Sequence, residues 1–583
     1  MRQLVWLAWM GGLVMGAGLE GLPEYLRPDP FGGVVRVDGG GPGSFRNSIE
    51  LAGARGGYVS FHLVVKMPEG GAYTLSLVCP GADLYREWFH FTEAGKSYYP
   101  DALIPVRAPY QSRLPEPDNR VEKQTAQAFW VDIWIGPDAR PGVLEGQATL
   151  EAGGTRSVLP IRVKVLPAVI PEEDVVTMDH NSYGSSWIPE RYQSDAFFAR
   201  IHAHHRIFYE HRGVYHQLGY GHGGKVGPEF APELEGAGRG KRVSSWSLFD
   251  RHYGPLLDGS AFAGTRRGAR PIPFVYLPIN PEWPASFLWW GEPGYEVEFV
   301  NVVSEMERHF REKGWTRTHF ELFFNHKKRY KAFPWDGDET RFPEDNRYFV
   351  EYARLLKKAM PAQTPVRFVF RADVSWMMEQ QFKELAGVIN FWVCGGTEFG
   401  WYDYAPRMLK QRGDIVWFYG GTPPVTQVSS AITTNPLRAW MWGVDGYVHW
   451  QTVAPGRDPW FHFDGGGTAL VYPGDRFGIQ GPIASLRLKV ERNAVQDITL
   501  LDSFKSKRPL EGLKAEAARR YNGAKPQDWW TPRPSLADLP SYEWTNTSID
   551  EAPKPNQRLF ARLEAAAFEK VHRFVMELAG EGK

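Results

Sequence analysis

The sequence changes character at about Pro171, and this change limits the possible folds more than any other feature. After it, short apolar runs that resemble strands alternate with segments whose apolar residues recur at helical spacing. That alternation is typical of a parallel β/α fold. Eight strand-like runs are present, which is the number that closes a (β/α)8 TIM-type barrel. They cover residues 175–180, 214–219, 274–279, 319–324, 366–370, 389–393, 415–419 and 447–450.

Residues 33–166 show a different pattern, with short alternating runs separated by Gly and Pro turns and no competing helical periodicity. This pattern predicts an antiparallel β-sandwich. A chain of 583 residues is also too long for a single hydrophobic core. We therefore expect a multidomain protein, with a β-sandwich over 30–168, a barrel over 172–505 and a C-terminal helical extension over 506–583.

Amphipathic helices are predicted between the strands and after the last of them. One apolar stripe contains Phe349, Tyr352 and Leu355. Such stripes are typical of helix faces that pack on a barrel. The predicted helices cover residues 191–211, 295–313, 346–360 and 376–386 between the strands, and 484–501 and 556–578 after them.

The charge balance excludes some classes of partner. The 67 Lys and Arg residues match 67 Asp and Glu residues, so the formal net charge is zero, and no long basic run occurs. Binding to nucleic acid or to a membrane surface therefore lacks its electrostatic basis. Aromatic residues make up 14% of the chain, and their flat rings suit both large cores and the faces of sugar rings.

The first 18 residues resemble a secretory signal peptide. A short positive start precedes an apolar stretch from Leu4 to Val14, and small residues follow, with a cleavage site expected near Ala17 or Gly18. No later segment is apolar for long enough to cross a membrane. We expect a secreted or periplasmic protein that is not membrane-bound once the signal is removed.

Polar residues that directly follow the predicted strands are the candidates for a binding site, because barrels of this type place their chemistry at the C-terminal ends of strands. A mixture of amides, charged groups and indoles suits a neutral polyhydroxylated ligand, whose hydroxyls need paired donors and acceptors. Trp335, Trp401 and Trp450 are the expected stacking platform, with Tyr183 beside them. The predicted substrate-binding residues are Tyr183, His216, Asn325, His326, Lys327, Trp335, Arg371, Trp401, Trp450 and Gln451.

Two pairs of carboxylates compete for the catalytic role. Asp373 and Glu398 follow adjacent predicted strands, whereas Asp338 and Glu339 lie in the long loop after the fourth strand. A glycosidase with two catalytic carboxylates needs them about 5 Å apart for retention, or roughly 6.5 to 9.5 Å apart for inversion. Asp373 and Glu398 satisfy this positional demand, because they follow adjacent strands and could face each other across the barrel mouth. A mixed arrangement, with Glu339 as the acid and Asp373 or Glu398 as its partner, is also open.

The sequence favours neither a metal centre nor an organic cofactor. His202, His204 and His205 cluster on a predicted helix, but no HExxH pattern accompanies them, and we expect them on a solvated helix face. The glycine-rich segment 221–225 lacks the spacing of a phosphate-binding loop. We therefore expect no metal among the site residues and no cofactor.

Two segments resemble a known family. Phe129-Trp130-Val131-Asp132-Ile133-Trp134-Ile135, followed by Pro137 to Gly142, is similar to the N-terminal sandwich that accompanies the catalytic domain of unknown function 4091. That group includes glycoside hydrolase family 123. Tyr472-Pro473-Gly474, the segment from Gly481 to Arg492, and Asp497 resemble the group's closing signature. The two ends bracket roughly residues 55 to 505.

The resemblance implies a sandwich, a (β/α)8 barrel and a β-N-acetylgalactosaminidase activity that uses an adjacent Asp-Glu pair followed by Pro. In that scheme Glu is the general acid and base, and Asp orients the substrate's 2-acetamido group, whose carbonyl oxygen is the nucleophile. Asp338-Glu339-Thr340 is the matching position here. It departs from the pattern because Thr340 replaces Pro and because the pair lies about a dozen residues beyond its strand.

Together these features predict a secreted glycoside hydrolase that acts on a neutral or N-acetylated carbohydrate by carboxylate acid and base catalysis. Two other hypotheses compete with it. The altered Asp-Glu-Pro motif is also consistent with a non-catalytic carbohydrate-binding protein on a decayed glycosidase barrel. A metal-dependent hydrolase is the third hypothesis, and loss of activity on chelation would favour it.

Overall fold

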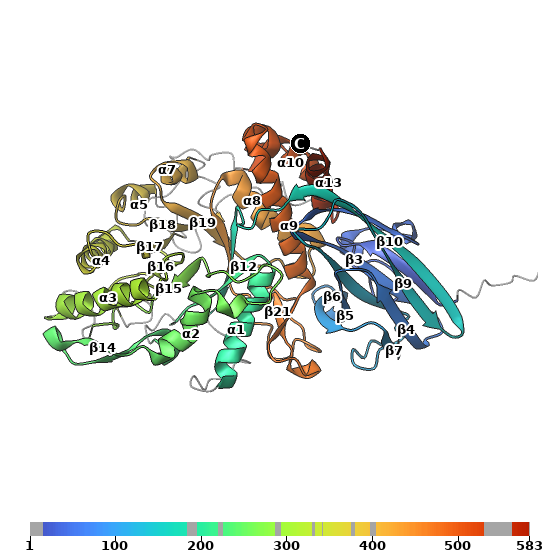
Figure 1. Cartoon of the computed structure of the whole chain (residues 1–583), viewed down its shortest axis with the longest axis horizontal. Coiled ribbons are helices and arrows are strands. Elements are labelled where there is room, and N and C mark those ends of the chain that lie inside the picture. The colour runs from blue at the N-terminus through green and yellow to red at the C-terminus, as the bar shows by residue number, and fades with distance from the viewer. Residues whose placement is uncertain are drawn as a thin grey trace, which may run out of the picture.

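The computed structural model describes residues 16–182, 195–219, 226–285, 293–328, 333–340, 342–374, 379–396, 404–529 and 563–581. A two-sheet sandwich formed by the first third of the chain lies beside a barrel formed by the middle (Figure 1). The long helix α9 (Leu486–Ser503) lies between them (Figure 1). Tyr183, Glu398 and Trp401 lie outside the described residues.

The sandwich consists of two five-stranded sheets among the described residues. Neighbouring strands pair antiparallel, as predicted, except that β2 and β10 run parallel. The strand β1 lies before the predicted domain start at residue 30. One sheet has the order β1 (Gly18–Pro23), β3 (Gly57–Lys66), β8 (Ala126–Ile135), β5 (Ala82–Thr92), β6 (Ser97–Val106). The other has the order β2 (Ile49–Arg55), β10 (Thr155–Val169), β9 (Gly142–Ala152), β4 (Gly71–Val78), β7 (Tyr110–Leu114).

Strand β8 is buried on both faces, which explains its nearly continuous apolar sequence. Phe129, Val131 and Ile133 point into the core between the two sheets. Trp130 and Asp132 point the other way, Trp130 into a core shared with the barrel and Asp132 onto α9. A strand covered on both sides needs apolar residues at most positions, because neither face meets water.

The second unit is a nearly closed barrel of eight parallel strands. All eight predicted strands are present, with shifted boundaries. Their order is β12 (Gly213–Gln217), β11 (Thr177–Ser182), β20 (Gly446–His449), β19 (Ile415–Gly420), β18 (Phe391–Gly395), β17 (Arg367–Val374), β16 (His319–Leu322), β15 (Phe274–Tyr276). The two ends of this order adjoin, since the rings of His216 on β12 and Tyr276 on β15 stack with centroids 3.7 Å apart.

Helices cover the outside of the barrel. In α4, the predicted stripe of Phe349, Tyr352 and Leu355 is buried, as expected. The expectation for the histidines of α1 was wrong, because His204 and His205 are buried rather than solvated. The helices are α1 (Asp195–Glu210), α2 (Ser247–Leu257), α3 (Tyr295–Glu312), α4 (Asn346–Ala359), α5 (Glu379–Glu384), α7 (Ala405–Gln411) and α8 (Thr434–Trp442).

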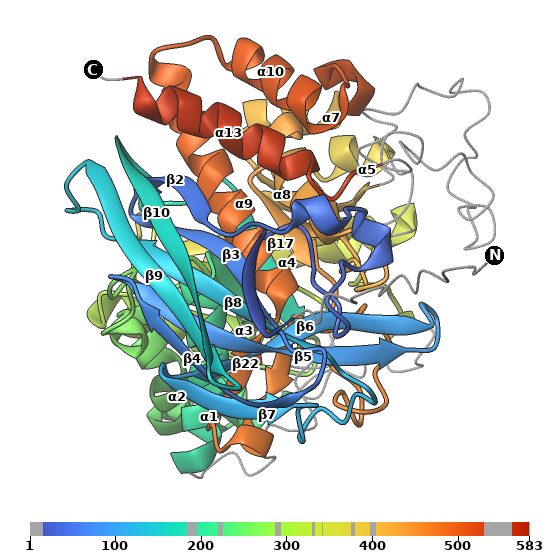
Figure 2. The ribbon, with the colours of Figure 1, turned by 90° about the vertical axis from the view of Figure 1, so that its right-hand side faces the viewer.

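The chain closes with α9, α10 (Leu510–Asn522) and α13 (Ala567–Gly580). Figure 2 shows α13 crossing beside β2 and β10 of the sandwich, with α9 behind it. Two short antiparallel pairs complete the fold, β13 (Glu233–Glu235) with β14 (Arg242–Ser245) and β21 (Val471–Pro473) with β22 (Pro482–Ala484). Within the described parts of the chain, no helix has the length and apolar character to span a membrane.

Ion pairs buried along α9 join the two units. Asp132 of the sandwich contacts Lys489 Nζ at 2.6 Å and Arg492 Nη2 at 2.7 Å. Asp101 of the sandwich contacts Arg487 Nη2 at 2.7 Å. Breaking one partner of such a buried pair is strongly destabilising, because the remaining charge stays out of water. The helix is therefore held to the sandwich by electrostatics as well as by packing.

Candidate active site

A cavity of about 250 Å³ opens at the C-terminal ends of the barrel strands. This is the end at which barrels of this type carry their chemistry. Three carboxylates and two cations face a partly apolar wall there. The lining residues are Asn181, Leu218, Phe323, Asn325, Lys327, Asp338, Glu339, Arg371, Asp373, Tyr419, Val448 and Trp450.

The loop after β16 folds back onto its own strand, which brings Asp338 and Glu339 to the cavity despite their distance along the chain. The carbonyl oxygen of His326 accepts hydrogen bonds from the backbone nitrogens of Gly337 at 3.0 Å and Asp338 at 3.2 Å. Gly337 permits this approach, because a Cβ there would come within 2.4 Å of the Cβ of Phe324. A larger residue would push the loop away from the strand end.

Asp336 and Asp345 fix the other side of this loop. The Oδ1 atom of Asp336 accepts a hydrogen bond from the backbone nitrogen of Lys328. The Oδ2 atom of Asp345, which directly precedes α4, accepts one from the backbone nitrogen of Asp336 at 3.1 Å and contacts Lys328 Nζ at 2.9 Å. The loop is thereby tied to both the strand before it and the helix after it.

The ammonium group of Lys327 lies between the two carboxylates of the loop. Its Nζ atom is 3.1 Å from Asp338 Oδ2 and 2.5 Å from Glu339 Oε2. Burial lowers the pKa of Lys327, but the two carboxylates outweigh burial and raise it overall. Lys327 is therefore a permanent cation at neutral pH that offsets the repulsion between two adjacent acids.

Glu339 has an unusual backbone conformation. Its φ angle is +54°, in the left-handed region that residues with a Cβ seldom adopt. Such a conformation costs on the order of 1–3 kcal/mol and recurs at active sites and ligand clamps. In the described residues it also occurs at five other non-glycine positions, among them Lys96 and Gln451. The side chain is 25% exposed, and its Oε1 atom accepts a hydrogen bond from the hydroxyl of Tyr419 at 3.3 Å. The carboxylate of Glu339 therefore lies at the cavity surface, on a backbone in a strained conformation.

Asp373, at the end of β17, faces the same cavity but is bound more tightly. Arg371 holds both of its oxygens, with Nε 2.7 Å from Oδ1 and Nη2 3.1 Å from Oδ2. Burial raises the pKa of Asp373 to about 6, although Arg371 acts in the opposite direction. Asp373 can thus change its charge near neutral pH, but its oxygens already have a partner.

A buried polar network supports this wall from inside the barrel. His216 lies between Asp179, with Nδ1 2.8 Å from Oδ2, and Glu321, with Nε2 3.2 Å from Oε1. Burial lowers the pKa of His216, but the two carboxylates reverse the effect and raise it to about 9. Glu321 also contacts Arg371 at 3.2 Å, and Tyr276 accepts a hydrogen bond from Arg371 at 2.8 Å. The network fixes Arg371, which in turn fixes the position of Asp373.

Many of the predicted site residues meet at this cavity. Those that line it are Asn325, Lys327, Asp338, Glu339, Arg371, Asp373 and Trp450. Trp450 is 40% exposed, so its indole ring is available to a ligand. Gln451 follows it, with a φ angle of +59°, and does not line the cavity.

Besides Gln451, three predicted binding residues lie away from the cavity lining. Trp335 is fully buried and stacks on Tyr348 at 4.8 Å, so it belongs to the core rather than to a sugar platform. His326 is also fully buried, with its ring against Trp335. His216 belongs to the buried network. Long loops after strands can supply core residues as well as site residues, and an aromatic side chain in such a loop has no sequence signature that separates the two uses.

The structure adds cavity residues that the sequence prediction did not include. Tyr419 is the last residue but one of β19, and Asn181 is the last residue but one of β11. Both are polar residues at strand ends, where the strand-end rule applies. Leu218 and Phe323 also follow strands, but they are apolar and look like core residues in the sequence.

The carboxylates of the cavity each face Lys327 or Arg371, so this donor set does not fit a metal centre.

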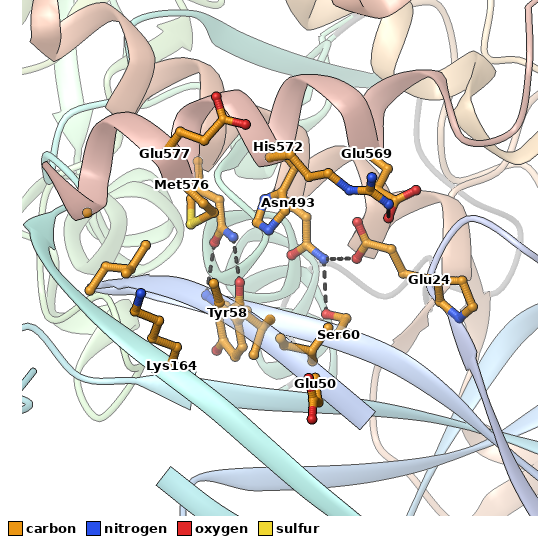
Figure 3. A pocket seen from close by; sticks show the side chains of 18 of the residues that line it. Glu24, Glu50, Tyr58, Ser60, Lys164, Asn493, Glu569, His572, Met576 and Glu577 are labelled. Carbon is orange, nitrogen blue, oxygen red and sulfur yellow. Dashed lines mark hydrogen bonds and ion pairs between the residues drawn. The ribbon is translucent and has the colours of Figure 1, made fainter. Parts of the chain in front are cut away.

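A larger cavity, of about 650 Å³, lies between the sandwich, α9 and α13. Figure 3 shows its polar groups, where Asn493 donates to Glu24 at 2.6 Å and to Ser60 at 3.0 Å. Burial raises the pKa of Glu24 to about 7, and contact with Asp497 raises the pKa of His572 to about 9 against the effect of burial. This cavity is remote from the strand ends, so its titrating groups bear on how α13 is held.

No protein-family model and no curated protein matches the chain. The structure, however, is similar to that of a family 123 glycoside hydrolase from Clostridium perfringens, described in work on glycolipid glycan hydrolysis, with a TM-score of 0.63 and 13% identity. The match covers 97% of this chain and 99% of that one. At this identity the likeness concerns the fold, and it extends over both the sandwich and the barrel.

Other solved structures match less well. A putative α-galactosidase from Bacteroides fragilis has a TM-score of 0.26 at 10% identity, over 77% of this chain and 78% of that one. A β-glucuronidase from Parabacteroides merdae has a TM-score of 0.28 at 9% identity, over 76% of this chain and 50% of that one. These scores are too low to support an inference. On the strength of the Clostridium perfringens structure alone, the chain shares its two-unit architecture with a family 123 glycoside hydrolase.

Proposed function

We propose that the protein is a glycoside hydrolase whose reaction takes place in the cavity at the C-terminal end of the barrel. The observation that carries this proposal is the position of Lys327 Nζ, 3.1 Å from Asp338 and 2.5 Å from Glu339, on the wall of that cavity. Two adjacent carboxylates are costly to hold together without a cation. The Lys327 contact and the backbone strain at Glu339 both support a functional role for the pair.

In the proposed reaction, Glu339 is the general acid and base and Asp338 orients the substrate. Glu339 protonates the glycosidic oxygen while the carbonyl oxygen of a 2-acetamido group attacks the anomeric carbon and the bond to the leaving group breaks. Water then attacks the oxazolinium intermediate, and Glu339 takes its proton. Asp338 stabilises the positive charge that develops on the acetamido nitrogen. The exposed side of Glu339 faces the cavity, where it can exchange its contact with Lys327 for the substrate oxygen.

This assignment implies a glycan that carries an N-acetylhexosamine unit as the substrate. An adjacent pair of carboxylates provides no nucleophile across the sugar ring, so the nucleophile must come from the acetamido group of the sugar itself. Trp450 is the proposed stacking surface for the sugar ring, and Asn181 and Asn325 are proposed to bind its hydroxyls. We also propose that the protein is exported, on the strength of the signal-like first 18 residues.

A different acid is favoured by one observation. Asp373 has a pKa of about 6, which suits a general acid near neutral pH, and Glu339 would then be its ionised partner. Against this arrangement, Arg371 already occupies both oxygens of Asp373. We therefore assign the acid role to Glu339 and a supporting role to Asp373.

The test is hydrolysis of 4-nitrophenyl β-glycosides of N-acetylgalactosamine, N-acetylglucosamine, galactose and glucose by the full chain. We expect turnover of an N-acetylated substrate only, inhibition by a thiazoline analogue of the oxazolinium, and a loss of about 10²–10⁴-fold in kcat for Glu339→Gln. The exposed Glu344→Gln is the matched control and keeps full activity.

Two outcomes would contradict the proposal. Binding of N-acetylhexosamine without turnover by the wild type would favour a carbohydrate-binding protein. Equal turnover of galactosides and N-acetylgalactosaminides, with loss of activity in Asp373→Asn but not in Asp338→Asn, would favour a mechanism with two catalytic carboxylates.

A further inference from the structure

A second cluster of chemically active side chains lies outside the cavity, between the barrel and α9. It consists of His180 on β11, His449 on β20 and Glu491 on α9, and all three are fully buried. His180 and His449 are direct partners across the parallel pair β11 and β20. Their strand neighbours Asp179 and Val448 point into the barrel, so the two imidazoles point outward, toward the helix.

The three side chains present ligand atoms to one small volume. One atom of each residue lies within 4.8 Å of the other two. His449 Nε2 is 2.5 Å from Glu491 Oε1, and His180 Nε2 is 3.4 Å from Glu491 Oε2. Two ligands bound to one tetrahedral zinc ion at about 2.0–2.1 Å are roughly 3.3 Å apart, which is close to the second of these distances.

Three buried atoms of this cluster lack the hydrogen bonds that buried polar groups normally make. Within the described residues, neither ring nitrogen of His180 has a hydrogen-bond partner, and neither does Glu491 Oε2. His180 Nε2 and Glu491 Oε2 are 3.4 Å apart but do not have the geometry of a hydrogen bond. Leaving such a group unsatisfied costs about 1–3 kcal/mol. Burial lowers the pKa of His180 well below its usual value, so the ring is neutral and has a lone pair to offer.

The residues around the cluster orient its two imidazole rings and leave room for them. His449 Nδ1 is 3.2 Å from the hydroxyl of Thr422, the kind of outer contact that orients an imidazole toward a metal. The ring of His180 stacks on Phe208 at 4.4 Å, and a Cβ at Gly213 would come within 2.4 Å of its Nε2 atom. The glycine thus leaves the space that the ring occupies.

We propose that His180, His449 and Glu491 bind one divalent transition-metal ion, with zinc as the preferred metal, and that this ion pins α9 to the barrel. Two imidazoles and one carboxylate form a donor set that zinc accepts. Because the cluster is closed to solvent among the described residues, the ion has no access to substrate and its role is structural. The ion enters as the chain folds, when the three residues are still accessible.

The test is the metal content of the tag-free full chain, produced in medium supplemented with zinc, nickel, copper and cobalt and then dialysed. We expect about one zinc ion per chain by mass spectrometry of the metals. His180→Ala and Glu491→Gln are expected to lose it, whereas the exposed His462→Ala retains it. His462 is the matched control because it also pairs with a carboxylate, that of Asp458 at 2.8 Å.

A second measurement covers the case in which a variant fails to fold. Wild-type chain unfolded with a chelator and refolded with cobalt should show visible absorption from cobalt bound in the cluster, and should unfold at a higher temperature than chain refolded without metal. Background levels of all four metals in folded wild type would overturn the proposal. Equal metal content in the wild type and in folded His180→Ala would overturn it as well.

Discussion

The backbone nitrogen of Thr340 donates a hydrogen bond to the carbonyl oxygen of Asp373, at 3.0 Å. This bond ties the loop that carries Asp338 and Glu339 to the end of β17. Proline has no backbone N–H, so the residue found in the Asp-Glu-Pro pattern could not make this contact. The departure from the pattern therefore has a structural meaning in this chain, since the threonine supplies an anchor for the loop.

Thr340→Pro should weaken this anchor. We expect a loss of about 1 kcal/mol from the hydrogen bond and a fall of at least about 10-fold in kcat, because small displacements of a catalytic group are costly. Thr340→Val keeps the N–H and removes only the hydroxyl, which is 3.3 Å from the same oxygen. Near-wild-type kinetics for Thr340→Val and reduced kcat for Thr340→Pro, measured on the same substrate, would support the role of the backbone bond.

Lys327→Met should reduce activity by removing the positive charge that contacts both Asp338 and Glu339. We expect kcat/KM to fall by roughly 10–100-fold, as for loss of other preorganised charges in a site. Lys327→Arg retains the charge and should recover part of that loss. Steady-state kinetics of both variants, with circular dichroism to confirm folding, provide the test. Equal kinetics for wild type and Lys327→Met would remove the main support for the Asp338 and Glu339 pair.

Asp373 should make the protein less stable as the pH rises from about 4 to about 6. Its pKa is raised from 3.8 to about 6 in the folded chain, so its contribution to stability is complete below pH 3.8 and is lost as the pH passes 6. Asp373→Asn cannot ionise and should lack this component of the pH dependence. Urea unfolding of both chains at several pH values in this window gives the comparison, and parallel curves would contradict the prediction.

Trp450→Ala should weaken substrate binding more than it slows the chemical step. The indole is 40% exposed at the cavity, and contact with a sugar face is lost when the ring is removed. We expect KM to rise by about 10-fold, which corresponds to about 1.4 kcal/mol. Trp450→Phe preserves a ring and should stay within a few-fold of the wild type. A fall in kcat with unchanged KM would place Trp450 outside the substrate-binding surface.

The attachment of α13 should weaken between pH 7 and 9. The pKa of Glu24 is raised from 4.5 to about 7, and that of His572 from 6.5 to about 9. Both shifts are upward, so the contribution of Glu24 to stability is lost between about pH 4.5 and 7, and that of His572 between about pH 6.5 and 9. The change expected from pH 7 to 9 therefore comes from His572. Hydrogen exchange of residues 567–580 should therefore accelerate toward pH 9, after correction for the intrinsic rate. His572→Gln should flatten this change.

The architecture could be predicted from the sequence because it depends on periodicity. Each of the eight predicted barrel strands exists, and the apolar stripe of 346–360 is the buried face of α4. Boundaries shifted in both directions. The strand β15 ends at Tyr276, before the predicted residue 279, whereas β17 continues through polar residues to Val374. At those polar positions the strand is held by backbone hydrogen bonds to its neighbours, which every residue type except proline can make in full.

The site was only partly predictable because its formation depends on a loop. Asp338 and Glu339 reach the cavity through backbone hydrogen bonds to His326 and a close approach at Gly337. No spacing rule encodes such contacts. Trp335 was assigned to the sugar platform because it is an aromatic residue in a site loop, yet the ring packs on Tyr348. The strand-end rule pointed to Arg371 and Asp373, which lie on β17 and line the cavity.

The cluster of Asp132 with Lys489 and Arg492 has a consequence for how genes of this type can evolve. A recombination event that exchanged the N-terminal region for an unrelated module would leave Lys489 and Arg492 without their anion, deep in the protein. Such a chimaera would be lost unless the helix changed in the same step. The two regions should therefore be inherited together in any lineage that keeps these three residues.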